Sequence, residues 1–338
     1  MAIVSTTYAP NEWQFAMKAE TTTGTINVAT MQKINVDDVA TMSQEVTQTL
    51  DARSTPGRTV KFADAFVTDK GGHKTTVSIS GVFDTTVGPL LLSNALGEAV
   101  GSSPASYDMA YNYAPAARAH GATTGTIVNT FTFAIVPPIA SKAIVLPGCV
   151  CSDLEVTFDK ANEGGRGHFT ATIETAYKPL ASQGTPSSMA VYGATFRYLR
   201  EFNTKKTVFI SGGSALDVVL NKVGYKIANN VTYTGFQGSD GDPELLQRAI
   251  PAADISLMLG VKYDANTEML WSTRRDGTSI GIEISDNATW SSSTFGVKAG
   301  FCQLDADVVP TGTDAGVFED LSLKCLGSTT GDLIQIVP

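Results

Sequence analysis

The stretch GCVCSDLEVTFDKANEGGRGHFTATIETAYKP, residues 148–179, decides the fold class. Leu154, Val156 and Phe158 alternate with polar residues, and after a glycine-rich turn Phe169 resumes the same alternation. Alternation with a period of two puts apolar side chains on one face of a strand and polar side chains on the other. The stretch therefore predicts an antiparallel hairpin with one buried face and one polar face.

The same alternation recurs along the rest of the chain. It marks further strands at residues 76–83, 130–135, 223–227, 280–284, 321–323 and 334–336. Two short helices are expected between the strands, at residues 89–98 and 267–276, and residues 243–249 are a candidate for a third. Proline near the start and glycine just past the end support the first helix. The fold class is therefore mainly β with short helices (α+β).

Composition limits the classes of function. The chain has 338 residues, of which 43% are hydrophobic and 17% charged, so it can bury a core and is not a disordered chain. Its net charge of −9 is spread evenly, which argues against a sequence-reading nucleic-acid binder because such a protein needs a basic face. The start lacks the pattern of a secretory signal, and no apolar run approaches the length of a membrane helix. We expect a chain made in a cytoplasm that does not bind membranes.

Two pairs of segments indicate an internal repeat. VSISGVFDTTVGPLLLSNALG begins at Val77 and LMLGVKYDANTEMLWSTRRDG begins at Leu257, an offset at which strand, turn and helix patterns coincide. VCSDLEVTF at Val150 similarly matches VFEDLSLKC at Val317. A fixed order of elements at a large period is typical of tandem duplication. We therefore predict two tandem antiparallel β-sandwich or barrel-like domains, each with a flanking helix, at residues 1–180 and 181–338.

No pattern in the sequence predicts an enzyme. The three histidines lie in glycine-rich surroundings, and hydrolase, zinc-protease, P-loop and dinucleotide-binding motifs are absent. Asp240, Asp242 and Glu244 loosely resemble a calcium loop but lack its spacing, and a turn before a helix explains the same residues. The four cysteines lack zinc spacing and are expected to be small buried side chains. We expect no enzymatic activity, cofactor or metal.

Residues 148–179 resemble the hallmark stretch of the bacteriophage major tail tube proteins, and Ile79–Gly97 is similar to that family's strand and leucine-rich helix. The length fits family members in which two tube domains are fused. The resemblance implies packed antiparallel sheets flanked by a helix, with a sheet from each domain lining a channel. It also implies a structural protein of the virion tail, assembled in the host cytoplasm. Its partners would be copies of itself, the tape measure, terminator and tip proteins, and double-stranded DNA passing without sequence preference.

The resemblance leads to two further expectations. The acidic chain predicts a negatively charged channel wall, and four carboxylates on alternating strands are candidates to line it: Asp153, Glu155, Glu174 and Asp320. Two tube domains per chain predict homotrimeric rings with pseudo-sixfold symmetry, stacked into a tube. If the second half were instead a decoration domain, six chains per ring would be expected. The alternatives are another virion protein, such as a tail tip, terminator or connector, or a carbohydrate-binding β-sandwich adhesin.

Overall fold

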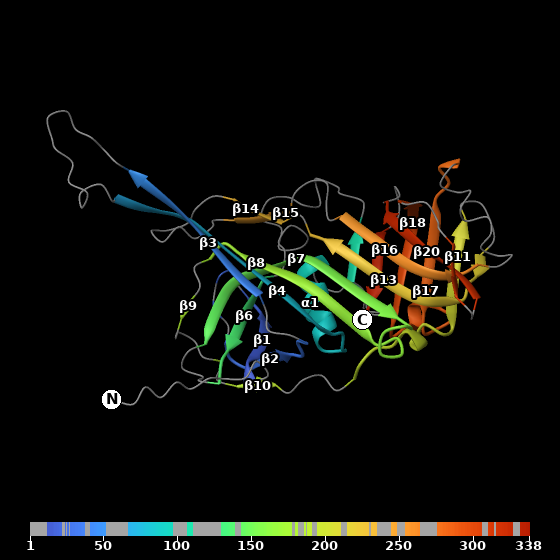
Figure 1. Cartoon of the computed structure of the whole chain (residues 1–338), viewed down its shortest axis with the longest axis horizontal. Coiled ribbons are helices and arrows are strands. Elements are labelled where there is room, and N and C mark those ends of the chain that lie inside the picture. Colours follow the sequence, from blue (N-terminus) through green and yellow to red (C-terminus); the bar gives the residue numbers. More distant parts are fainter. Residues whose placement is uncertain are drawn as a thin grey trace.

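The structure is a computed structural model, and it is mainly β. The residues that it describes are 12–21, 24, 26, 28–37, 41–51, 67–96, 107–110, 130–138, 143–177, 180–181, 186, 188–190, 195–210, 215–229, 231–234, 245–248, 254–263, 276–305, 310–313, 316–326 and 332–338. Nineteen strands in this part form one connected sheet, and two more form a separate ribbon (Figure 1). The mainly β prediction is therefore confirmed.

The elements are as follows. The strands up to residue 190 are β1 (Gln14–Ala19), β2 (Met31–Ile34), β3 (Thr41–Asp51), β4 (Val67–Val82), β5 (Tyr107–Ala110), β6 (Phe131–Val136), β7 (Ile144–Asp159), β8 (Gly167–Thr175), β9 (Leu180–Ala181) and β10 (Met189–Ala190). The later strands are β11 (Lys205–Ile210), β12 (Ala215–Asp217), β13 (Leu220–Ala228), β14 (Val231–Thr234), β15 (Leu245–Arg248), β16 (Asp254–Lys262), β17 (Ile280–Ser285), β18 (Gly296–Leu304), β19 (Pro310–Thr313), β20 (Gly316–Cys325) and β21 (Asp332–Val337). The described helices are α1 (Val87–Leu96) and two 3-10 turns, η4 (Leu199–Glu201) and η5 (Trp290–Ser292).

The centre of the fold is a run of seven antiparallel strands in the order β3–β4–β8–β7–β13–β16–β20. Figure 1 shows β8, β7, β13 and β16 crossing the front of the molecule, while the β3–β4 hairpin projects from one end. β7 and β13 pair from Asp159 opposite Lys222 to Asp153 opposite Ala228. This pairing joins the two halves of the chain into one continuous sheet.

Neighbouring strands repeat in the same order on the two sides of that junction. β3, β4 and β8 lie side by side in the first half, and β13, β16 and β20 do so in the second. The expected equivalence of β4 and β16 agrees with this order, since Val77 and Leu257 both face the core. The sequence match between residues 150–158 and 317–325 paired β7 with β20. In the structure, however, β20 lies beside β16 as β8 lies beside β4, so the counterpart of β20 is β8. The division into domains at residues 1–180 and 181–338 stays a prediction.

A hydrophobic core lies behind the seven strands. In the first half, α1, β1 and β6 pack against this core. In the second half the sheet extends from β20 through β18 and β17 to β11, each strand pairing with the next. Phe158 of β7 contacts three rings at centroid distances of 5.9, 5.3 and 5.4 Å, those of Phe83, Phe202 and Phe295. The aromatic contacts are mainly edge-to-face, a favourable geometry. The same core therefore serves both halves.

The first expected helix is confirmed, with an earlier start. α1 begins at Val87 because Oδ1 of Asp84 accepts hydrogen bonds from the backbone N–H groups of Thr86, at 2.7 Å, and Val87, at 2.8 Å. A carboxylate before the first turn satisfies donors that have no partner inside the helix. The second expected helix falls on residues 264–275, which lie outside the described residues.

Three segments contain short strands that the sequence pattern does not mark. Residues 245–248 form β15, which pairs with β14, so the candidate third helix is wrong. Between residues 101 and 126, where the sequence pattern marks no strand, the structure has β5, which pairs with β21 of the second half. At the expected domain boundary after residue 180 lies β9, which pairs with β7, and β10 at residues 189–190 pairs with β2. Backbone pairing decides these short strands, and for β5, β9 and β10 the partner is distant in sequence, so local composition does not reveal it.

Candidate functional site

The solvent-facing side of the seven-stranded sheet is polar, and we call it the polar face. Residues opposite one another in the register point to the same side, so the members can be read from the strand pairing. On β4, β8, β7, β13, β16 and β20 they are Lys74, Thr76, Ser78, Ser80, His168, Thr170, Thr172, Glu174, Asp153, Glu155, Thr157, Asp159, Lys222, Gly224, Lys226, Ala228, Asp254, Ser256, Met258, Gly260, Lys262, Asp320, Ser322 and Lys324. Most of the alternate residues whose burial the structure describes belong to the core, among them Leu154, Leu257 and Leu321.

All four carboxylates proposed from sequence lie on the polar face. Asp153 and Asp320 are exposed, and Glu155 and Glu174 are partly buried. Glu174 forms an ion pair with Lys74 of β4, with 3.4 Å between its Oε2 and the lysine Nζ. The structure therefore brings residues that are up to 167 positions apart in sequence onto one surface. Their role as channel-lining residues stays a prediction.

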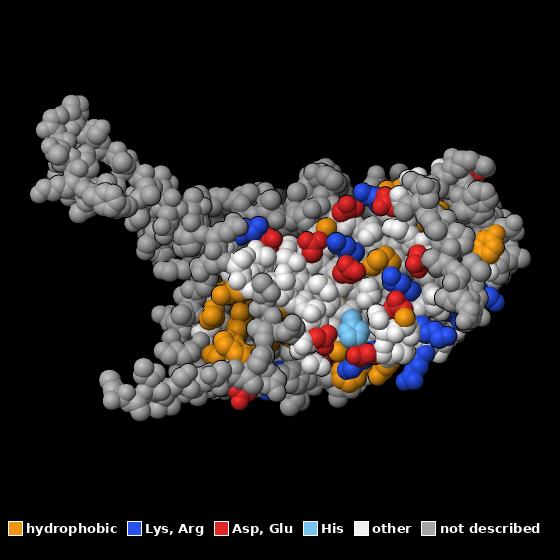
Figure 2. Space-filling model, viewed as in Figure 1, with side chains coloured by type: hydrophobic (Ala, Val, Ile, Leu, Met, Phe, Trp, Pro, Cys, Tyr) orange, Lys and Arg blue, Asp and Glu red, His pale blue; other side chains and the backbone are white. Residues whose placement is uncertain are grey.

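Charges of both signs are mixed on the polar face. Glu155 lies directly opposite Lys226, and Asp159 lies directly opposite Lys222, across the β7–β13 junction. The listed residues of the six strands from β4 to β20 include six carboxylates and five lysines: Asp153, Glu155, Asp159, Glu174, Asp254 and Asp320, against Lys74, Lys222, Lys226, Lys262 and Lys324. Figure 2 shows acidic and basic side chains intermingled over this surface. The described part of the face is therefore close to neutral, although the chain as a whole is acidic.

The polar face begins where β7 changes its pairing partners at Gly148, a position that we call the corner. Before the corner β7 pairs with β6 and β9, and after it β7 pairs with β8 and β13. Gly148 sits at the corner with φ +60, and a Cβ there would lie 2.3 Å from the Tyr177 ring. Only glycine adopts this conformation without strain and leaves room for the ring. The register then shifts between Cys151 and Asp153, as expected for a bulge.

A buried network of two asparagines holds this bulge. Asn94 of α1 accepts a hydrogen bond at its Oδ1 from the backbone N–H of Cys151. Asn229, which follows β13 and is fully buried, donates from Nδ2 to the carbonyl oxygens of Asn94, at 3.3 Å, and Cys151, at 3.1 Å. The network fixes α1, β7 and β13 relative to one another at the junction of the two halves. Sequence reasoning did not find it, because isolated asparagines carry no local signal.

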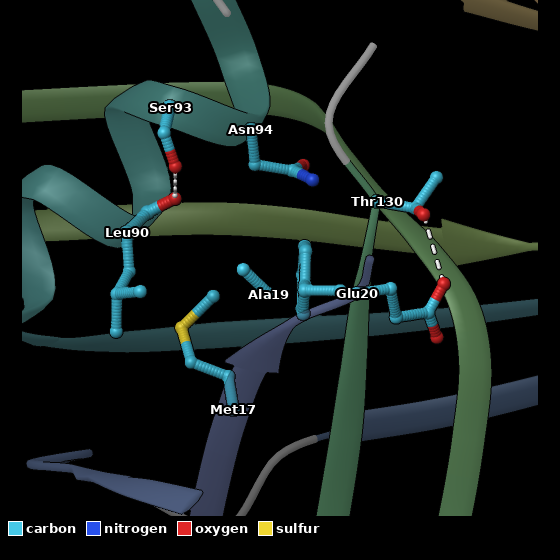
Figure 3. A pocket seen from close by; sticks show the side chains of 8 residues that line it. Met17, Ala19, Glu20, Leu90, Ser93, Asn94 and Thr130 are labelled. Carbon is cyan, nitrogen blue, oxygen red and sulfur yellow. Dashed lines mark hydrogen bonds between the residues drawn. The ribbon is translucent and has the colours of Figure 1, made fainter. Parts of the chain in front are cut away.

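One small pocket opens between α1 and the β1–β6 strands. Its volume is about 90 Å³, and it is lined by Met17, Ala19, Glu20, Leu90, Ser93, Asn94, Thr130 and Phe131 (Figure 3). Ligand pockets usually measure about 300–1,000 Å³, so this space suits a few waters rather than a substrate. The Glu20 carboxylate accepts hydrogen bonds from the hydroxyls of Thr130 and Thr132, each at 2.8 Å, and from the backbone N–H of Gly148 at 2.9 Å. Glu20 therefore has a structural role beside the β7 corner.

The residues considered for chemistry have other surroundings in the structure. His168 lies between two carboxylates, with Nδ1 3.5 Å from Asp37 and Nε2 3.6 Å from Glu163, an arrangement that suits an ion pair. The side chains of His73 and His120 and the candidate calcium loop at residues 240–244 lie outside the described part. Within that part, no group of three or more His, Cys, Asp or Glu residues could hold a metal ion. Likewise, the described helices include none long and apolar enough to span a membrane.

The cysteines are buried, as expected. All four are free thiols inside the core: Cys149, Cys151, Cys302 and Cys325. Sequence spacing gave no reason to connect Cys302 with Cys325, yet the structure places them opposite each other on β18 and β20.

The comparisons with known proteins do not assign a family to the fold or to the polar face. Neither the protein-family models nor the curated proteins contain a match to the chain.

Proposed function

We propose that this chain is a structural virion protein that polymerises into stacked rings, forming a phage tail tube through which DNA passes into the host. The observation that carries the proposal is the seven-stranded sheet that runs through both halves of the chain. One face of this sheet is a core and the other is a broad polar surface with intermingled charges. A channel wall needs such a surface, continuous along the subunit.

The charge pattern of the polar face suits passage without binding. Proteins that hold DNA do so with lysines and arginines that release counterions from the phosphates. On the polar face Lys226 lies opposite Glu155, Lys222 lies opposite Asp159, and Lys74 is paired with Glu174. Each of these lysines already has a carboxylate beside it, so a passing phosphate gains little from it. Charge compensation at close range thus supports passage without binding, and the net negative wall expected from composition stays a prediction.

The strand order supports trimeric rings. Each chain supplies two similar sets of adjacent strands, β3–β4–β8 and β13–β16–β20, so three chains supply six. Head-to-tail contacts that close on themselves would make a ring, in which β3 at one end of the sheet meets the next subunit. Such closure also covers an edge strand, and exposed edges otherwise favour uncontrolled aggregation. The tape measure, terminator and tip proteins are the further partners in this proposal.

Electron microscopy of the purified full-length chain tests the proposal. We expect rings or hollow tubes in negative stain, and a cryo-EM map in which the polar face lines the channel and three chains form each ring. A chain that stays monomeric at high concentration, alone and with its tail partners, would contradict tube formation. A map with six identical subunits per ring would retain the tube and refute the trimer. A sugar-binding signal on a glycan array would instead favour the adhesin alternative.

A further inference from the structure

Two thiols face each other between β20, the last of the seven strands, and its neighbour β18. Cys302 of β18 lies directly opposite Cys325 of β20, and their sulfur atoms are 3.8 Å apart. Cys302 is fully buried and Cys325 is 5% exposed. No other pair of elements brings two cysteines together in the described part, because Cys149 and Cys151 are neighbours on one strand.

The register at this point is the one that accommodates a cross-strand disulfide. The backbone N–H of Leu326 donates to the carbonyl of Phe301 at 2.8 Å, and that of Asp305 donates to the carbonyl of Ser322 at 2.9 Å. Hydrogen-bonded and non-hydrogen-bonded residue pairs alternate along an antiparallel ladder. Phe301 and Leu326 form a hydrogen-bonded pair, so the next pair, Cys302 and Cys325, is a non-hydrogen-bonded one. In such pairs the Cα atoms are only about 4.5 Å apart, inside the range of about 4.4–6.8 Å found for disulfides. A small movement of the two sulfur atoms therefore suffices to join them.

We propose that Cys302 and Cys325 are a reversible oxidation site, forming an intramolecular disulfide when the folded protein meets a peroxide. The thiolate of Cys325 attacks one peroxide oxygen, which gives a sulfenic acid and releases one water. The Cys302 thiol then attacks the sulfenic sulfur, and the second water leaves. In sum, two thiols and one hydrogen peroxide give one disulfide and two waters, and the two sulfurs supply the two electrons that the peroxide accepts.

A small oxidant is required because the site is enclosed. The hydrogen bond with Cys302 and burial both raise the pKa of Cys325 above the usual range of thiols, so little thiolate is present and oxidation is slow. A peroxide molecule can enter a packed sheet more easily than glutathione disulfide. Cys149 and Cys151 direct their Sγ atoms at the carbonyls of Leu146 and Asp153 rather than at another thiol. We expect these two cysteines to stay reduced under the same treatment.

The disulfide would tie the polar face to the layer behind it. β20 carries Asp320 and Lys324 of the polar face, and β18 belongs to the layer formed with β17 and β21. A bond between them closes a covalent loop and restricts the unfolded chain. On the proposed function, a particle assembled in a reducing cytoplasm and released into an oxidising medium would meet the conditions for this bond. The oxidation chemistry itself does not depend on that function.

Peptide mapping of the folded wild-type chain tests the proposal directly. Trypsin cuts after Lys298 and Lys324, which places Cys302 in peptide 299–324 and Cys325 in peptide 325–338. After incubation with hydrogen peroxide, alkylation and non-reducing digestion, we expect these two peptides to be linked and to separate with dithiothreitol. The melting temperature of the oxidised protein should rise by about 5 °C and return on reduction.

Two variants serve as controls. Cys302→Ala removes one partner and should abolish both the linked peptide and the rise in melting temperature. Cys149→Ala makes the same change at a buried cysteine without a facing thiol, and should retain both. A link involving Cys149 or Cys151 would overturn the proposal. So would a folded wild-type chain whose Cys302 and Cys325 stay unlinked, whether still reduced or oxidised to sulfinic acid, while the same chain in urea forms disulfides.

Discussion

The two ends of β7 lie in different environments although they belong to one strand. From Val145 to Val150 every residue is buried, whereas from Asp153 to Asp159 buried residues alternate with exposed or partly buried ones. The outer side of the first end is covered by a second apolar cluster, which contains Ala16, Met31, Ala134, Val136, Ala143 and Val145. The outer side of the second end is the polar face. Alternation therefore identifies a strand with one covered face, and a continuous apolar run identifies a strand covered on both.

The largest expected effect comes from placing the same charge at the two ends. Val145→Asp puts a carboxylate into the second apolar cluster, and we expect a loss of about 4 kcal/mol or a failure to fold, since a buried charge without a partner is costly. Thr157→Asp makes a similar change on the polar face and should cost less than about 1 kcal/mol. Urea unfolding of both variants measures the difference. Equal losses would show that the outer sides of the two ends do not differ in burial.

The corner between the two ends can be tested next. Gly148→Ala must adopt a left-handed backbone conformation and also meets the Tyr177 ring, so we expect a loss of about 3 kcal/mol in the free energy of unfolding. Tyr177→Ala added to this variant removes the steric clash but not the backbone cost. A double-mutant cycle should therefore give a favourable coupling of about 1–2 kcal/mol between the two changes. Purely additive losses would contradict the contact between Gly148 and Tyr177.

The asparagine network tests what holds the bulge beyond the corner. Asn229→Ala removes the donors to the carbonyl oxygens of Asn94 and Cys151 and leaves both buried without these bonds. We expect a loss of about 2 kcal/mol, measured by thermal or urea unfolding. Asn203→Ala, at an exposed position, is the matched control and should change stability by less than about 0.5 kcal/mol. A loss no greater than that of the control would mean that the network does not fix the junction.

The smallest effect on stability, but a large one on binding, is expected on the polar face. Glu155→Gln with Asp159→Asn leaves Lys226 and Lys222 without the carboxylates opposite them, at a cost of less than about 1 kcal/mol. DNA should then bind the assembled protein at low salt. The slope of log K against log salt concentration should become steeper by about 1.8, because about 0.9 is expected per unpaired lysine.

A charge-matched variant distinguishes local pairing from net charge. Glu12→Gln with Asp217→Asn removes the same number of charges from positions outside the polar face. If pairing on the face prevents binding, DNA should not bind this control under the same conditions, as measured by filter binding across a salt series. Equal binding by both variants would mean that total charge alone governs the interaction.

Much of the local structure could be predicted from the sequence. The alternation at residues 153–158 and 169–173 marked β7 and β8, and the leucines after Pro89 marked α1. β5 and β15 were missed because each is four residues long and is stabilised by pairing with β21 and β14. The near-neutral polar face was also missed, because composition reports the total charge and not which side chains lie opposite one another.

The sequence by itself determined that the chain forms strands with one apolar face, that α1 follows β4, and that the four candidate carboxylates point away from the core. Only the tertiary structure decided that β7 pairs with β13, that Cys302 meets Cys325, and that the first end of β7 is covered on both sides. The physical reason is that backbone hydrogen bonds are the same for every residue type, so a strand does not encode its neighbour locally. The neighbour is selected by long-range burial of whole faces, which depends on all the other strands at once.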